Sequence, residues 1–150
     1  MQLCAADNIA NAEFDAATTL CKRVVFEDSD SVMTCSLLED ASSFKERYHF
    51  DGGAIAVQHK LTLVADRNMA AVWLESSFHH ECMRKGVCAV VTMNDGRQLL
   101  VGISARFGTE QPLRPIEIIS SSGSRLSDVP TITFTLESYD TSPAALLGSD

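Results

Sequence analysis

The stretch from residue 66 to residue 104 constrains the fold most, because a helical repeat changes there directly into a strand repeat. Asp66 is a candidate N-cap. Apolar side chains then recur at steps of three and four, the spacing of one buried helix face: Met69, Ala70, Trp73, Leu74, Phe78 and Cys82. Two basic residues and then Gly86 follow, as is typical of a helix C-terminus. The pattern predicts a helix over residues 67–85.

Beyond Gly86 the sequence is typical of a β-hairpin. Residues 87–93 are rich in β-branched and apolar side chains. Asn94, Asp95 and Gly96 follow, and these residues tolerate the positive φ of a tight turn. Residues 98–104 form the return strand, so we expect a hairpin over residues 87–104.

The other predicted strands depend on period-two alternation. Residues 54–65 alternate over a length that suits a long strand, and residues 131–138 alternate threonine with apolar side chains. Weaker strand patterns occupy three further segments, residues 19–27, 32–38 and 113–120. Residues 39–53 leave two readings open: a strand that turns at residues 51–53, or one helical turn or mobile loop.

The order of these elements predicts the fold class. About seven strands and one helix, joined mostly by short turns, favour the α+β class with mainly antiparallel β structure. We expect a sandwich or barrel of about seven strands with one flanking α-helix. A chain of 150 residues corresponds to a single domain over residues 1–150. Residues 1–18 are interpreted as an arm with a short helical turn around residues 12–17, and residues 139–150 as a tail without periodicity.

Composition narrows the classes of function. The net charge of −8 argues against general or sequence-specific binding to nucleic acid, which needs clustered lysine and arginine. No apolar run reaches the roughly 20 residues that span a bilayer, so no membrane partner is expected. The first seven residues lack the basic segment and the following apolar segment of a signal peptide, which predicts a chain made in the cytosol.

The five cysteines, at positions 4, 21, 35, 82 and 88, contain no Cys-x-x-Cys pair. This spacing disfavours both a disulfide framework and a zinc finger, and it favours buried thiols. A nucleophilic cysteine needs a partly exposed, electropositive setting. Cys35 and Cys88 instead lie in strand patterns typical of a core.

One cluster of metal-ligand residue types lies on the predicted helix. Glu75, His79 and Cys82 have the i, i+4 and i+7 spacing of one helix face, and His59 is an alternative third ligand. Zinc normally needs three or four converging ligands, and no second His/Cys pair follows at ligand spacing. A solvated helix face with a core thiol explains the cluster better. We therefore assign no catalytic, cofactor-binding or metal-ligating residue, and no cofactor.

The order of a long strand, a helix, a hairpin and two further strands resembles the tail-tube-like fold of bacteriophage tail proteins. Three segments look like those of uncharacterised phage or prophage structural proteins: residues 95–102, 108–114 and 140–144. The resemblance covers about residues 54–144. It implies a non-enzymatic structural virion protein of a tail tube, tail-completion ring or baseplate. Such a protein would be made in the host cytoplasm, form homo-oligomeric rings and contact other virion tail proteins, without a cofactor.

In such a ring, strands of adjacent subunits continue one another, and we expect the interface on residues 87–104 and 131–138 and in the arms. Two alternatives stay open. A small monomeric β-sandwich binding module or accessory protein would show an apolar or aromatic groove near Trp73 and Phe107. A metal-dependent enzyme would use the helix that carries His79 and Cys82.

Overall fold

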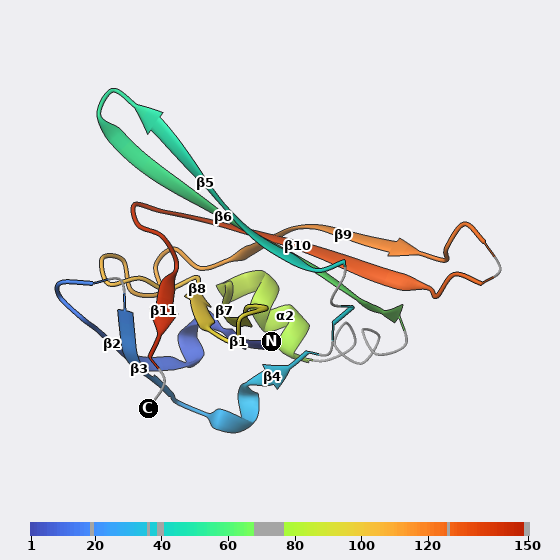
Figure 1. The fold of residues 1–150 in the computed structure, drawn as a ribbon. Helices are drawn as coiled ribbons and strands as arrows, with labels where there is room; N and C mark the ends of the chain where they lie inside the picture. Colours follow the sequence, from blue (N-terminus) through green and yellow to red (C-terminus); the bar gives the residue numbers. More distant parts are fainter. Residues whose placement is uncertain (19, 36, 39–40, 68–76, 126, 149–150) are drawn as a thin grey trace.

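The computed structural model describes residues 1–18, 20–35, 37–38, 41–67, 77–125 and 127–148. Within these ranges the strands form two sheets, and one α-helix, α2 (Ser77–Lys85), lies beside them (Figure 1). The predicted α+β class with mainly antiparallel strands and one flanking helix is confirmed.

Sheet A has seven strands in the order β2-β3-β11-β8-β7-β1-β4 and curls into a half-barrel. Its pairs are antiparallel except for β3 with β11. In chain order its strands are β1 (Gln2–Ala5), β2 (Ile9–Phe14), β3 (Leu20–Phe26), β4 (Met33–Thr34), β7 (Val87–Thr92), β8 (Gln98–Val101) and β11 (Ala145–Leu147). Two short 3-10 turns, η1 (Ala6–Asn8) and η2 (Ser29–Ser31), lie between these strands.

Sheet B has four longer, fully antiparallel strands in the order β5-β6-β10-β9. These are β5 (Ser43–Asp51), β6 (Ala54–Asp66), β9 (Arg114–Ser121) and β10 (Thr131–Asp140). The expected strands over 54–65, 113–120 and 131–138 are thereby confirmed. For residues 39–53, the described part forms β5 and a turn at Gly52 and Gly53, both with positive φ, so the strand reading is the correct one.

The predicted hairpin is present as β7 and β8. Its turn closes through hydrogen bonds from Met93 N to Arg97 O and from Gly96 N to Met93 O. The return strand ends at Val101 rather than at residue 104 because Gly102 takes φ +87°. A Cβ atom at Gly102 would lie 2.6 Å from the Val87 carbonyl oxygen, so only glycine fits there.

The C-terminal part of the predicted helix is confirmed as α2. Its Cys82 is fully buried, and Gly86, with φ +88°, ends the helix and donates its N–H to Cys82 O. Asp66, the expected N-cap, is the last residue of β6. The expected apolar positions Met69, Ala70, Trp73 and Leu74 lie outside the described residues.

The interpretation of residues 1–18 as an arm is wrong. β1 lies inside sheet A between β7 and β4, with Leu3 and Cys4 almost fully buried. β2 occupies residues 9–14, where a helical turn was expected to begin. Small side chains such as Ala5 and Ala6 fit against the core without a strong apolar period, so alternation over these residues is too weak to predict a strand.

The interpretation of residues 139–150 as a tail is also wrong. β10 continues to Asp140, and β11 inserts between β3 and β8 of sheet A. A strand of three residues is too short to show alternation, and the partners that order it are far away in sequence. The strand expected over 19–27 is confirmed as β3, whereas of residues 32–38 only Met33 and Thr34 form a described strand.

Two apolar clusters hold the layers together. One fills the space between the sheets and includes Leu3, Leu61, Phe134 and Cys82 of α2. The other fills the concave side of sheet A and includes Cys4, Cys21, Cys88 and Leu100. Successive residues of β7 alternate between the two clusters, so this strand is buried on both faces.

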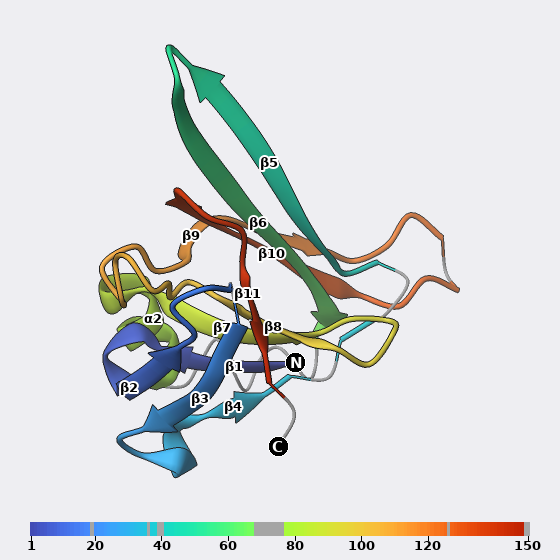
Figure 2. The same cartoon turned by 60° about the vertical axis from the view of Figure 1, so that its left-hand side comes forward.

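Sheet B is longer than the sheet it covers. In both views the β5–β6 hairpin projects away from sheet A, and the β9–β10 pair ends on the opposite side (Figures 1 and 2). The far end of the hairpin therefore has no layer of its own chain beneath it.

Candidate functional site

A row of three polar side chains crosses the inner face of sheet B. Glu46 of β5 is the cross-strand partner of His59 of β6, which is the partner of Ser138 of β10. Side chains alternate between the two faces of a strand, so all three lie on the face that carries Phe44, Leu61 and Leu136. Their positions are those of core residues, yet each brings a hydrogen-bonding group.

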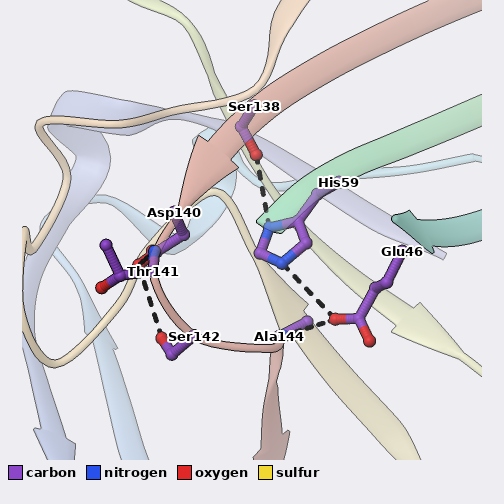
Figure 3. Close-up of polar contacts among 7 residues, drawn as sticks. All are labelled: Glu46, His59, Ser138, Asp140, Thr141, Ser142 and Ala144. Carbon is purple, nitrogen blue, oxygen red and sulfur yellow. Dashed lines mark hydrogen bonds and ion pairs between the residues drawn. The ribbon is translucent and has the colours of Figure 1, made fainter. Parts of the chain in front are cut away.

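The three side chains touch in line (Figure 3). Ser138 Oγ lies 3.5 Å from His59 Nδ1, and His59 Nε2 lies 3.4 Å from Glu46 Oε1. His59 and Ser138 are only 4% and 5% exposed. The histidine–glutamate contact lies at ion-pair distance and lacks the geometry of a directed hydrogen bond. The row is thus loosely bonded, with its histidine and serine buried and its Glu46 side chain 24% exposed.

Glu46 has a second partner, which connects the row to the next strand. Its Oε1 accepts a hydrogen bond of 2.6 Å from the N–H of Ala144, the residue just before β11. Burial raises the pKa of the Glu46 carboxyl, but the interaction with His59 and the bond from Ala144 outweigh this and hold the pKa below its ordinary value. The carboxylate form is therefore the one that the fold stabilises.

The connection from β10 to β11 is ordered by its own side chains. Asp140 Oδ1 accepts bonds from Thr141 N at 2.6 Å and Ser142 Oγ at 3.4 Å. Arg106 donates to Thr141 Oγ1 at 3.3 Å. Together with the Glu46–Ala144 bond, these contacts direct the chain from sheet B into sheet A.

A serine, a histidine and a carboxylate in line raise the question of nucleophilic catalysis. The geometry does not favour it. A serine nucleophile must reach its substrate, and Ser138 is 5% exposed. A small, partly open apolar pocket lies elsewhere, among residues of sheet A and its turns that include Cys4, Phe26 and Leu100. The row is better suited to joining β5, β6, β10 and the segment before β11.

Those residues considered for metal binding that the structure describes do not converge. Among the described residues, no group of three His, Cys, Asp or Glu side chains is placed to hold a metal ion. His59 belongs to the polar row, Cys82 is buried in the apolar core, and His79 packs edge-on against His80 at 5.7 Å between ring centroids. Glu75 lies outside the described residues.

The cysteines are core residues, as predicted. All five are free thiols; Cys35 is half-buried and the others are buried. Burial raises the pKa of Cys4 and Cys82 to about 12 and that of Cys88 further. Such thiols stay protonated and are poor nucleophiles. Of the expected aromatic groove, Phe107 is half-buried beneath the Arg106 guanidinium at 5.1 Å, and Trp73 is outside the described part.

A second feature is the apolar surface of sheet B. At the far end of the β5–β6 hairpin, Phe50 is 76% exposed and Tyr48 and Ile55 are about half exposed. On the opposite edge, β9 exposes Ile116, Ile118 and Ile119. Large apolar side chains gathered on edge strands mark an interaction surface more often than isolated ones do.

The polar row is not among the sites that the sequence predicts. Glu46 lies in residues 39–53, for which the sequence allows two structures, and Ser138 ends a strand pattern of ordinary alternation. A signal existed, because alternation from Phe44 to Phe50 places Glu46 on the apolar stripe, and alternation in β6 does the same for His59. Polar residues at inward positions of two strands indicate a buried polar contact.

Comparison with protein-family models, with curated proteins and with solved structures finds no match to this chain. In the part of the chain that the structure describes, no helix has the length and apolar character needed to cross a membrane.

Proposed function

We propose that this chain is a structural virion protein of a phage tail, a component of the tube, the tail-completion ring or the baseplate, and that it assembles into rings through the two edges of sheet B. The observation that carries the proposal is the exposed apolar surface on both edge strands, with Phe50 76% and Ile116 55% exposed. Such edges are open to pairing with another chain. The strands expected at the interface from the sequence, within residues 87–104 and 131–138, are instead inner strands of the two sheets. The resemblance to tail proteins adds the biological setting.

The topology of sheet B suits head-to-tail assembly. Its four strands alternate in direction, so the edge strands β5 and β9 run opposite to each other. When β9 of one copy meets β5 of the next in the same orientation, the new pair is antiparallel and the alternation continues. A heterologous contact of this kind closes into a ring when the rotation between copies allows it.

The side chains of the two edges are also compatible. On the inner face, Tyr48 and Phe50 of β5 would meet Ile118 of β9. On the outer face, β5 carries Lys45 and Arg47, and β9 carries the carboxylate of Glu117. Apolar groups then face apolar groups, and opposite charges share a face.

In this proposal the protein acts mechanically rather than as an enzyme, without a cofactor. Its partners are further copies of itself and other virion tail proteins. It is made in the host cytoplasm and resides in the virion, with no membrane and no sequence-specific nucleic acid as a partner.

The solution mass tests the assembly. We expect light scattering across a concentration series to give a defined higher oligomer, and negative-stain images to show rings or tubes. Ile118→Lys places a charge on the β9 edge and is expected to abolish the oligomer. Met83→Lys removes a similarly exposed apolar side chain from α2, at 48% exposure, and should leave it intact.

The biological setting needs a separate measurement. Pull-down with the virion proteins encoded beside this chain is expected to recover at least one tail protein. A strict monomer at every concentration that also captures no tail protein would contradict the proposal. Such a monomer would instead favour a small β-sandwich binding module that uses the aromatic end of the β5–β6 hairpin.

A further inference from the structure

β11 holds an unusual place in sheet A. It lies between β3 and β8, and in the described residues it is the strand that joins the β2–β3 hairpin to β8, β7, β1 and β4 (Figure 2). It pairs with β8 from Ala145 to Leu147 and in parallel with β3 at Leu146 and Leu147. A three-residue strand thus occupies a slot with a backbone edge on each side.

The slot matches a short apolar peptide. Ala145 is 5% exposed and belongs to the cluster on the concave side of sheet A, where Leu147 also packs. Ala144 belongs to the cluster between the sheets. Main-chain pairing on both sides supplies affinity and the small and apolar side chains supply selectivity, as in other strand-addition sites.

Besides its pairing with β3 and β8, β11 is held by one hydrogen bond at each end. Ala144 N donates to the Glu46 carboxylate, and Gly148 N donates to Cys21 O at 2.8 Å. The connection that precedes it is held to the body through side chains, including the Arg106–Thr141 bond, and it contains Pro143, which has no N–H to donate. Opening this connection breaks few main-chain bonds.

We propose that the slot between β3 and β8 is a strand-exchange site, in which residues 144–147 of a second copy of this chain replace the resident β11. The second copy is the occupant because it carries the same strand and makes the same contacts. Exchange requires the connection over residues 141–144 to open and β11 to leave its pairs with β3 and β8, and the incoming strand forms the same pairs again. Exchange would link copies at sheet A, independently of contacts at the edges of sheet B.

Engineered disulfides in the full chain test the exchange. Leu99 of β8 and Leu146 of β11 are cross-strand partners. One chain with Leu99→Cys and a second, mass-tagged chain with Leu146→Cys are mixed at rising concentration and oxidised. We expect a disulfide-linked heterodimer whose yield rises with concentration, several-fold above that of unmodified chains, whose native thiols set the background.

A matched control separates exchange from random collision. Val91 of β7 is the other cross-strand partner of Leu99, but the tight β7–β8 turn keeps these strands in one chain. Mixing Leu99→Cys with Val91→Cys chains should give background linkage only. The double variant Leu99→Cys/Leu146→Cys in one chain reports the resident strand by closing within the chain.

Equal linkage in the exchange mixture and the control mixture would overturn the proposal. So would absence of linkage in the double variant, because β11 would then not occupy the slot. Repeating the exchange with Ile118→Lys in both chains distinguishes this proposal from ring assembly: loss of rings with retained linkage leaves exchange standing, and rings without linkage refute exchange alone.

Discussion

Sheet A and the projecting end of sheet B are built from similar strands but use their apolar residues differently. In sheet A, neighbouring residues such as Val101 and Leu100 are 0% and 1% exposed because both faces are covered. At the far end of β5 and β6, Phe50 and Ile55 are 76% and 48% exposed. The first region gains stability from its own chain, whereas the second leaves its apolar area exposed. The comparison teaches that alternation identifies a strand without identifying what covers it.

The largest expected difference between the regions comes from truncating one apolar side chain in each. Leu100→Ala should lower the free energy of unfolding by about 2–5 kcal/mol, because it leaves a cavity in a packed cluster. Phe50→Ala should change it by less than about 0.5 kcal/mol, because the ring is mostly in water. Both substitutions are made in the Ile118→Lys chain, which is expected to be a monomer, and urea unfolding measures the change in free energy for each. Similar losses at the two sites would show that the hairpin end is covered within one chain.

Two glycines with positive φ extend the comparison to the backbone. Gly53→Ala in the β5–β6 turn should cost roughly 1–2 kcal/mol, the strain of a left-handed residue, since nothing lies within 4 Å of the added Cβ. Gly102→Ala adds a clash with the Val87 carbonyl, and overpacking contributes about 1–3 kcal/mol more. The midpoint temperature of thermal unfolding should be clearly lower for Gly102→Ala than for Gly53→Ala. Equal midpoints would show that sheet A relaxes around the new methyl group.

The polar row that joins the two sheets should give an intermediate effect. Glu46→Ala removes the acceptor of the Ala144 N–H and should cost about 1–3 kcal/mol. Glu46→Gln keeps an acceptor oxygen and loses the charge, so it should cost less. Because the pKa of Glu46 is lower in the folded chain, the unfolded chain binds the proton first as pH falls.

The stabilisation from the Glu46 charge is therefore complete above its ordinary pKa of 4.5 and is lost as pH falls through the lower folded pKa. The difference in free energy of unfolding between the native chain and Glu46→Gln should decrease over that pH interval. The carboxylates of Asp15, Asp28 and Asp95 also have lowered pKa values. Both chains contain them, so their contribution cancels in the difference between the native chain and Glu46→Gln. A gap that stays constant with pH would mean that the charge does not support the row.

How far the fold was predictable follows the range of the interactions that form it. The β7–β8 hairpin and the long strand β6 were predictable because turn chemistry and alternation are local. β1 and β11 were not, because they are short and are ordered by strands distant in the sequence. Ser138 lies 79 residues from His59, so the polar row emerges only when the register of sheet B is known.

The outer face of sheet B provides the smallest expected effect and the finest test of the comparison. Lys60 Nζ lies 3.6 Å from Glu137 Oε1 on neighbouring strands, and the lysine side chain is 47% exposed. The Glu137 side chain is 16% exposed, so the pair is open to solvent mainly on its lysine side and should show a coupling of about 0.2–1 kcal/mol in a double-mutant cycle with alanine. The coupling should weaken as salt screens the charges. A larger, salt-insensitive value in the monomer would mean that this face is desolvated, and the contrast between a covered inner face and a wet outer face would fail.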